Sequence, residues 1–317
     1  MEKKISVLIP AYNEVENVAP LSKAIVDVFA KELAAYEYEI IFIDNKSTDG
    51  TRGVLCELCK NNPQIKAIFN AKNFGHIKSP YHGLLQATGD CVISMCADFQ
   101  DPPELIPQFV RAWEEGYKIV IGIKTNSKES GLMYAIRTLY YRTIKKISDV
   151  DQIEHFTGFG LYDKDFIQVL RDLNDPMPYL RGIVAELGYD RKEIEYEQPR
   201  RKAGKTKNNF YTLYDMAMLG ITSYSKVVLR LATIIGFIFA ASSFVLALIY
   251  LILKLTNWEQ YPAGTAPILI GLFLIGSVLM FFIGFIGEYV LNINSRVMKR
   301  PLVVEEKRIN FTAEKDD

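Results

Sequence analysis

Cysteine and histidine are scarce in this sequence, which has four cysteines and three histidines in 317 residues. Four cysteines are too few for a disulfide scaffold in a chain of this length. Cys56 and Cys59 have the spacing of a metal or redox pair, but zinc needs further ligands, and none of the histidines is paired with this motif. We interpret the two cysteines as buried residues of a helix.

Net charge, internal repeats and an export signal are also lacking. The 37 basic and 37 acidic residues cancel, so no overall field attracts nucleic acid, and no nucleic-acid partner is expected. No repeat of about 20 to 50 residues is visible, which sets repeat architectures aside. The apolar stretch before Pro10 is too short for the apolar part of a signal peptide, so we expect no export signal there.

Two long uncharged runs are present in the C-terminal third of the sequence. Residues 231–253 form the first run and residues 260–287 form the second. Each is long enough to cross the hydrocarbon core of a membrane, which takes about 20 helical residues. We predict a transmembrane hairpin at about 231–253 and 265–287, and the alternative is a buried hairpin in a soluble core.

Basic residues flank the predicted hairpin on its outer sides. They are Lys226, Arg230, Arg296, Lys299 and Arg300. Since cytoplasmic flanks of membrane helices are rich in lysine and arginine, we expect a multi-pass protein of the inner (cytoplasmic) membrane with both termini in the cytoplasm. Residues 210–229 mix tyrosine, leucine and methionine with polar positions, which predicts an amphipathic helix lying on the lipid bilayer.

Short apolar runs alternate with helical patterns in the N-terminal part of the chain. The predicted strands are 5–10, 38–43, 65–69 and 91–96, and the predicted helices are 13–33, 51–61 and 77–87. This alternation indicates an α/β fold whose mostly parallel sheet is covered by helices on both faces. A ligand is expected at the carboxyl ends of the strands, where the polar residues gather.

Three polar segments follow predicted strands and carry most of the functional signal. They read PAYNE at 10–14, DNKSTDGT at 44–51 and ADFQDPPE at 97–104. Together with the apolar hairpin, they resemble the family 2 glycosyltransferases of the GT-A fold. Within that family the chain is similar to the polyisoprenyl-phosphate glycosyltransferases, which include dolichyl-phosphate mannose synthase and the bactoprenol glucosyltransferases.

The resemblance covers nearly the whole chain and implies a domain organisation. It implies a GT-A (Rossmann-like) catalytic domain at 1–208, an interfacial amphipathic helix at 209–229, a transmembrane hairpin at 230–291 and a cytoplasmic tail at 292–317. Relatives form oligomers through the membrane part, so a homo-oligomer is also expected. The catalytic domain is expected in the cytoplasm.

A divalent cation, Mg²⁺ or Mn²⁺, is the cofactor that the resemblance implies, with Asp98 and Gln100 as matching ligands. Such a cation neutralises the charge that builds on a nucleoside diphosphate as the sugar departs. Many relatives carry a D-x-D motif here, whereas this chain has Cys96 in place of the first aspartate. Because a thiol is a poor ligand for Mg²⁺, the diphosphate and water are expected to complete the coordination. The alternative for this segment is an ordinary turn in which proline starts a helix.

Further residues match family positions that contact the nucleotide sugar, for which a UDP-sugar is the expected partner. They are Pro10, Tyr12, Glu14, Asp44, Lys72, Asn73 and Asp98. Asn45 stands where a second aspartate is frequent, and Lys72 replaces an arginine of an R-N-F-G segment. The alternatives are a side-chain helix cap at 44–50 and a plain loop at 72–76.

Residues 200–207 contain five basic residues and no acidic one, just ahead of the membrane helices. This composition suits a lipid phosphate, and it resembles the family segment R-x-x-G-x-S/T-K. The residues that the resemblance implies for catalysis are Asp98, Arg137, Arg142, Arg181, Arg201 and Lys207. The alternative for 200–207 is nonspecific attraction to anionic lipid.

A catalytic base is not carried over from the family. Thr157 and Gly160 stand where many relatives have an aspartate and an arginine. A phosphate monoester is already largely ionised at neutral pH, so a phosphate acceptor needs no strong base.

The predicted reaction is inverting transfer of glucose from UDP-glucose onto a polyisoprenyl phosphate such as undecaprenyl phosphate. It would take place at the cytoplasmic membrane face and give a lipid-linked sugar for modification of cell-envelope glycans. UDP-GlcNAc and UDP-galactose are alternative donors. A processive polysaccharide synthase would need a Q-x-x-R-W segment, which is absent from the sequence. A non-catalytic nucleotide-sugar-binding partner is the rival hypothesis, because of Cys96.

Overall fold

The computed structural model of the protein describes residues 3–126, 153–199, 265–298 and 300–311, together with scattered positions between 218 and 256. The chain divides into two compact units. The first comprises Met1–Tyr141, Asp151–Asn209 and Met298–Asp317, and the second comprises Arg142–Val150 and Phe210–Val297.

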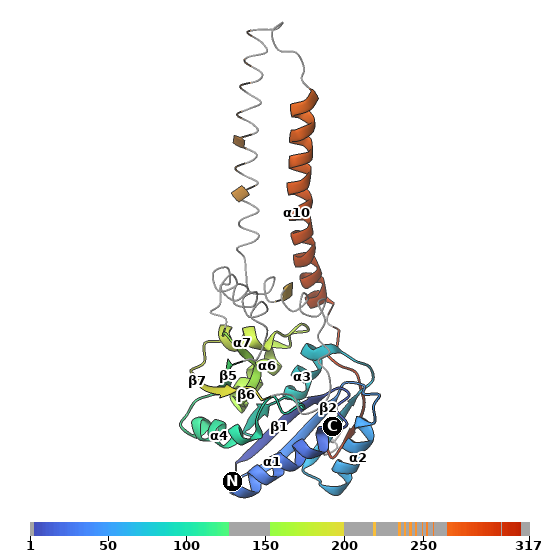
Figure 1. Cartoon of the computed structure of the whole chain (residues 1–317), viewed down its shortest axis with the longest axis vertical. Coiled ribbons are helices and arrows are strands. Elements are labelled where there is room, and N and C mark those ends of the chain that lie inside the picture. Colours follow the sequence, from blue (N-terminus) through green and yellow to red (C-terminus); the bar gives the residue numbers. More distant parts are fainter. Residues whose placement is uncertain are drawn as a thin grey trace. The chain divides into compact units, whose positions relative to one another are not determined.

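The first unit is built on one mixed sheet of eight described strands in the order β7-β5-β6-β4-β1-β2-β3-β8 (Figure 1). The strands are β1 (Lys4–Ala11), β2 (Glu37–Asp44), β3 (Ile65–Asn70), β4 (Cys91–Ser94), β5 (Ile119–Asn126), β6 (Phe156–Asp163), β7 (Arg191–Glu197) and β8 (Glu305–Ile309). The pairs β1–β2, β1–β4, β2–β3 and β5–β7 are parallel, whereas β6 and β8 run antiparallel to their neighbours. The predicted α/β fold with a mostly parallel sheet is confirmed.

Helices cover both faces of this sheet. They are α1 (Val18–Glu32), α2 (Thr51–Asn61), α3 (Gly75–Leu85), the short 3₁₀ helix η1 (Pro103–Leu105), α4 (Ile106–Glu114), α6 (Lys164–Leu173) and α7 (Leu180–Glu186). α1, α2 and α4 contribute to one apolar cluster, and α3, α6 and α7 contribute to the other. The sheet therefore separates two cores, as expected when parallel strands are buried on both faces.

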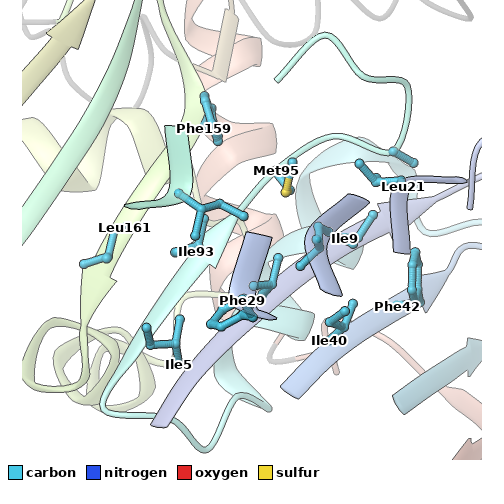
Figure 2. Packing of buried hydrophobic residues seen from close by; sticks show 14 of the residues in the cluster. Ile5, Ile9, Leu21, Phe29, Ile40, Phe42, Ile93, Met95, Phe159 and Leu161 are labelled. Carbon is cyan, nitrogen blue, oxygen red and sulfur yellow. The ribbon is translucent and has the colours of Figure 1, made fainter. Parts of the chain in front are cut away.

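Alternation along the strands assigns side chains to the two cores. Ile5 and Ile9 of β1 pack with Phe29 of α1, and the intervening Leu8 packs in the opposite cluster. Figure 2 shows Ile5, Ile9 and Phe29 together with Ile40 of β2 in the first cluster. Successive strand residues point to opposite faces, so near-continuous apolar strands are needed when both faces are covered.

Most predicted elements are confirmed to within a few residues, and α2 has the predicted bounds 51–61. α1 begins at Val18 instead of residue 13, because the chain first makes a turn in which the backbone N–H groups of Asn17 and Val18 donate to the carbonyl oxygen of Glu14. A helical side-chain spacing thus extends beyond the helix into the loop that precedes it.

The C-terminal segment differs from the expected tail. The sequence analysis assigned 292–317 to a cytoplasmic tail after the hairpin, but Glu305–Ile309 forms β8 and pairs antiparallel with β3. Asn310 extends this docking, since its side chain donates to the carbonyl oxygens of Cys59 at 2.6 Å and Ile65 at 2.8 Å. The apolar pattern of the sequence did not predict this strand, because its residues are mostly charged and an edge strand needs no apolar run.

The second unit contains α10 (Thr265–Val297), which includes the second predicted span and continues past Glu288. Within the described residues, Val278–Ser295 is the one helical segment long and apolar enough to cross a membrane by length and composition, and none of it is buried. The prediction ended this span at 287 because it stopped at the first charge, which does not end a helix. The first predicted span, 231–253, lies mostly outside the described residues.

Candidate active site

The candidate site lies at the carboxyl edge of the sheet. Parallel register places the ends of β1, β2 and β3 side by side, with Ala11 beside Asp44 and Asp44 beside Phe69. β4 ends at the same edge because it runs parallel to β1. β5 and β7 also end there, since β6 reverses the direction between β4 and β5. The polar segments of the sequence therefore converge on one edge, where α/β proteins bind ligands.

Unusual backbone geometry is concentrated at this edge. Four of the six non-glycine residues with positive φ in the described chain lie here, namely Asn13, Lys46, Phe99 and His155, at 56°, 67°, 62° and 59°. The first three follow β1, β2 and β4, and the fourth immediately precedes β6. Residues with a Cβ rarely adopt this conformation, and they cluster at sites where surrounding structure holds them for function.

The loop after β1 is hydrogen-bonded to the loop after β2. Ser47 Oγ accepts from the backbone N–H of Asn13 at 2.8 Å, and Asn13 Oδ1 accepts from the N–H of Thr48 at 2.7 Å. Thr51 Oγ1 accepts from the N–H of Glu14 at 2.9 Å. Segments 10–14 and 44–51, which the sequence analysis assigned to the nucleotide, thus form one structural unit.

Pro10, Tyr12 and Glu14 lie in this unit and are half-buried. Pro10 is in the last part of β1, and Tyr12 follows the strand. One carboxylate oxygen of Glu14 accepts from the side-chain amide of Asn17 at 2.7 Å, immediately before α1. Glu14 therefore stabilises its own turn in addition to any contact with a ligand.

Asp44 is fully buried, at 0% exposure, and its carboxylate is bound by protein groups. It accepts from Nε of Arg52 at 2.6 Å and from the N–H of Ser47 at 3.2 Å. Arg52 also donates from Nη2 to the carbonyl oxygen of Asn70, at the end of β3, at 2.8 Å. In this conformation Asp44 holds the loop and Arg52 in place, while its carboxylate offers no exposed surface to a nucleotide.

Asn45 connects the end of β2 to the loop after β3. Its Nδ2 donates to Asn73 Oδ1 at 2.9 Å and to the carbonyl oxygen of Gly75 at 3.0 Å. Its Oδ1 accepts from the N–H of Phe74 at 2.9 Å and from Asn70 Nδ2 at 3.1 Å. An aspartate, the frequent residue of relatives, has no N–H to make the first two bonds, so the amide suits this chain's own loop.

Lys72 and Asn73 are exposed on this loop. The ammonium group of Lys72 lies 5.1 Å from the centre of the Phe74 ring. Asn73 Oδ1 accepts from the N–H of Gly75, whose φ of 85° closes a tight turn that glycine adopts readily. The structure therefore has a basic residue beside a tight turn at the positions that the resemblance assigned to the nucleotide sugar.

The turn after β4 carries the predicted metal ligands Asp98 and Gln100. Asp98 is 5% exposed, and its Oδ1 accepts from the N–H of Gln100 at 3.1 Å. Asp101 Oδ2 accepts from the N–H of Cys96 at 2.8 Å and thereby closes the turn around them. The Cys96 side chain reaches solvent. Desolvation by the surrounding protein atoms, followed by the charges of Asp101 and Asp98, raises the pKa of this thiol well above its usual value.

Asp101 is the centre of a buried network. It is 2% exposed and accepts from the hydroxyl of Tyr196, on β7, at 3.0 Å. Burial raises the pKa of Asp101, and the hydrogen bonds from Cys96 and Tyr196 together with the charge of Lys124 offset this only in part. Tyr196 is also hydrogen-bonded to the side chain of Thr157. The network joins the turn that carries Asp98 and Gln100 to β6 and β7.

Close packing of two strands accounts for one departure from the family pattern. A Cβ atom at Gly160 would lie 2.5 Å from the carbonyl oxygen of Val120, because β5 and β6 approach closely here. No side chain, and so no arginine, fits at this position without a backbone shift.

Arg181 is half-buried at the start of α7, with its guanidinium 5.3 Å from the centre of the Tyr179 ring. The other predicted acceptor contacts, Arg137, Arg142, Arg201 and Lys207, lie outside the described residues. β5 ends at Asn126 and β7 ends at Glu197, and both strands end at the carboxyl edge. The chain thus leaves this edge shortly before each of the segments that contain these basic residues.

The donor set fits a hard divalent cation only in part. Within the described residues no three His, Cys, Asp or Glu side chains are grouped to hold a metal. Asp98 and Gln100 supply two oxygen donors from one turn, and Mg²⁺ in nucleotide enzymes usually binds one or two carboxylates plus substrate phosphates and water. The turn therefore fits a cation that arrives with its diphosphate.

A comparison with protein families identifies the family of this chain. The model of the family described as "Glycosyl transferase family 2" matches residues 6–187, which include most of β1 and all of β2 to β6. The chain belongs to glycosyltransferase family 2. It is accordingly a sugar-transferring enzyme of the GT-A α/β fold, as the sequence predicted.

Full-length relatives support this membership. The chain is 30% identical over 299 residues to the prophage bactoprenol glucosyl transferase homolog of Escherichia coli (strain K12), covering 94% of this chain and 97% of that one. It is also 30% identical over 305 residues to the bactoprenol glucosyl transferase of Shigella phage SfII, covering 96% and 98%. The uncharacterized glycosyltransferase YkcC of Bacillus subtilis (strain 168) is 30% identical over 303 residues, covering 95% and 93%.

Among solved structures, glucosyl-3-phosphoglycerate synthase from Mycobacterium tuberculosis in complex with Mn²⁺, UDP-glucose and phosphoglyceric acid is 16% identical, with a TM-score of 0.46. The match covers 69% of this chain and 78% of that one.

Several residues of the site carried no signal in the sequence. Arg52 lies inside a helix, Asp101 adjoins two prolines, Tyr196 lies on a charged strand and Glu306 lies near the C-terminus. Arg52 is bonded to Glu306, and Tyr196 is bonded to Asp101; the members of each pair lie far apart in the sequence, so only the folded chain brings them together. The buried positions of Asp101 and Tyr196 are likewise set by strand order.

Proposed function

We propose that this enzyme transfers a hexose, glucose from UDP-glucose, onto a polyisoprenyl phosphate at the cytoplasmic face of the inner membrane. The observation that carries the proposal is the convergence on one sheet edge of the Asp98 turn and of the strand ends that lead to the basic segments. The names of two relatives, bactoprenol glucosyl transferases, support a polyprenyl phosphate acceptor and glucose as the sugar.

In this proposal the nucleotide lies against the joined loops after β1, β2 and β3, with the diphosphate toward Lys72 and the Asp98 turn. Asp98 and Gln100 would hold Mg²⁺ or Mn²⁺, which would neutralise the charge growing on the leaving diphosphate. Asp101 keeps the turn closed and so fixes the direction of these two ligands. Pre-positioned ligands and charges of this kind lower the barrier without reorganising during the reaction.

In this proposal, positively charged side chains bind the acceptor. Arg137, Arg142, Arg181, Arg201 and Lys207 would bind the lipid phosphate and orient one of its oxygens toward the anomeric carbon. That oxygen forms the new C–O bond as the bond to UDP breaks from the opposite face, so the configuration inverts. The acceptor oxygen is already ionised at neutral pH, and Thr157 in place of an aspartate is compatible with a reaction that needs no base.

α10 and the first predicted span support membrane attachment. Ile268, Leu272 and Met280 of α10 are each at least 65% exposed, and the segment Val278–Ser295 is long enough to cross a bilayer. We propose that α10 and residues 231–253 form the two-helix hairpin and that the chain assembles as a homo-oligomer through it, with the catalytic unit in the cytoplasm.

The test is transfer by the detergent-purified chain supplied with undecaprenyl phosphate, Mg²⁺ or Mn²⁺ and a panel of UDP- and GDP-sugars. Mass spectrometry would detect the glycolipid. We expect product with UDP-glucose, loss of product in Asp98→Asn, and unchanged product in the control Asp27→Asn, which makes the same change at an exposed position on α1. Product with another sugar only would correct the donor.

A Cys96→Asp variant distinguishes the proposed enzyme from the alternative, a non-catalytic protein that binds nucleotide sugar. If the wild-type chain bound nucleotide sugar without transfer, and Cys96→Asp transferred it, the proposal would be wrong and Cys96 would be the cause. If both transfer sugar, we expect the variant to need less Mg²⁺, because a carboxylate binds this cation better than a protonated thiol.

A further inference from the structure

The C-terminal strand β8 brings the carboxylate of Glu306 to the loop and helix that follow β2. β8 runs antiparallel to β3, with Glu305 paired to Asn70, so it begins at the edge where β3 ends. The N–H of Ala71 donates to the carbonyl oxygen of Val304 at 2.9 Å, which holds this end of β8 against the loop after β3. No family position was matched to this strand in the sequence.

Glu306 binds two basic residues of the loop and helix that follow β2. Its carboxylate accepts from Lys46 Nζ at 2.8 Å and from Arg52 Nη1 at 3.0 Å. Lys46 is the residue with φ of 67° in the loop after β2. The Glu306 side chain is 44% exposed, so its ion pair with Lys46 lies at the protein surface and not in the core.

The other two guanidinium nitrogens of Arg52 donate hydrogen bonds to residues at the same edge of the sheet. Nε donates to Asp44 at 2.6 Å, Nη2 donates to the carbonyl oxygen of Asn70 at 2.8 Å, and the guanidinium lies 5.3 Å from the centre of the Phe69 ring. A guanidinium is a rigid fork, so fixing Nη1 with Glu306 also fixes the direction of Nε.

A continuous path of hydrogen bonds therefore runs from β8 to the loops of the site. Glu306 holds Arg52, Arg52 holds Asp44, and Asp44 accepts from the N–H of Ser47. Ser47 in turn accepts from the N–H of Asn13 in the loop after β1. The two loops joined by this path are those assigned to the nucleotide.

We propose that Glu306 is a positioning residue of the nucleotide site and that the C-terminal strand, acting through Arg52 and Lys46, orders the loop 44–51 for the nucleoside diphosphate. This inference rests on the proposed function for the identity of the ligand. The opposite role is a carboxylate that competes with the diphosphate for Lys46, and removal of Glu306 would then strengthen nucleotide binding.

The experiment compares Glu306→Gln with Glu305→Gln in the full-length chain in detergent. Glu305 lies on the same strand but is bonded to His82 and Arg308, so this control removes the same charge without touching the loop. We expect Glu306→Gln to raise the dissociation constant of UDP and the KM of the donor about two- to fivefold, as for an exposed ion pair, with kcat unchanged. Glu306→Asp, which keeps the charge, should restore part of the affinity.

Hydrogen exchange supplies a readout that needs no ligand. Backbone N–H groups of residues 44–51 should exchange faster in Glu306→Gln than in wild type or Glu305→Gln. Unchanged exchange with unchanged UDP affinity, or tighter UDP binding in Glu306→Gln, would overturn the inference. Wild-type protein that binds no nucleotide would overturn the proposed donor, whereas the exchange rates would still decide whether Glu306 orders the loop.

Discussion

At the scale of single residues, Asn45 and Tyr196 show how a side chain can matter through its hydrogen bonds alone. The side-chain amide of Asn45 both donates and accepts hydrogen bonds. Its four partners are the last residue of β3 and three residues that follow this strand. Tyr196 donates its hydroxyl to the buried carboxylate of Asp101. Neither residue needs to touch substrate, because each fixes a loop that carries predicted ligands.

The change Asn45→Asp should destabilise the protein. It replaces two N–H donors with acceptors that face Asn73 Oδ1 and the carbonyl oxygen of Gly75, and we expect a loss of about 1–3 kcal/mol in the free energy of unfolding. Chemical denaturation of wild type and variant measures it. Gln64→Glu, the same kind of change at an exposed position, is the control and should be neutral. Equal stability of all three proteins would contradict the role of Asn45.

The change Tyr196→Phe should loosen the turn that carries Asp98 and Gln100. It removes one hydrogen bond to the Asp101 carboxylate, at a cost of about 1–2 kcal/mol in stability, and raises the pKa of Asp101 further. The Mn²⁺ concentration for half-maximal sugar transfer should therefore increase, which a metal titration of activity measures. Tyr189→Phe, in the loop before β7, should leave the titration unchanged; an equal shift in both variants would argue against the network.

At the scale of elements, a buried glutamate ties three neighbouring strands together. Glu39 of β2 is 1% exposed and accepts from Ser6 of β1 at 2.6 Å. It pairs with Lys66 of β3 at 2.7 Å and with Lys4 at 2.9 Å. Burial by itself would raise the pKa of Glu39, but these partners and the N–H of Thr88 outweigh it and lower the pKa to about 2.

This glutamate predicts a pH dependence of stability. Because the pKa of Glu39 is lowered in the folded state, its contribution is complete above the ordinary value of about 4.5 and is lost as pH falls toward 2. The shift corresponds to about 3 kcal/mol. The stability gap between wild type and Glu39→Gln should therefore shrink as pH falls from 6 toward about 3 in denaturant titrations. Glu37→Gln, at an exposed position of the same strand, should show little gap at any pH.

At the scale of the whole molecule, the first compact unit is closed by a segment that follows α10 in the chain. Met298–Asp317 belongs to the same unit as β1–β7, although Phe210–Val297 separates them in sequence. A boundary drawn at residue 208, as the sequence suggested, therefore leaves out a strand of the catalytic sheet.

Deletion of 301–317 should expose the edge of β3. We expect the free energy of unfolding to fall by about 2–4 kcal/mol, because the β3–β8 ladder and the bonds of Asn310 are lost. The bare edge should also promote aggregation. Thermal unfolding and light scattering in detergent measure both effects. Deletion of 312–317 alone, beyond β8, is the control, and equal behaviour of the two truncations would contradict the role of β8.

The sequence by itself determined the α/β class, the strand and helix order to residue 96 and the family, and it predicted the metal-ligand turn and the nucleotide loops. These follow from local patterns: apolar runs give strands, and short motifs carry their own chemistry. The departures at Asn45 and Gly160 were visible in the sequence, but their reasons, a shared amide and a close strand contact, were not.

Only the tertiary structure decided that Glu305–Ile309 forms β8, that Glu306 binds Arg52, and that Asp101 is buried and hydrogen-bonded to Tyr196. These features depend on pairings between residues far apart in the chain, which no window of sequence contains. A charged edge strand such as Glu305–Ile309 has no apolar run by which a sequence pattern could predict it. Its register is set by its pairing with β3.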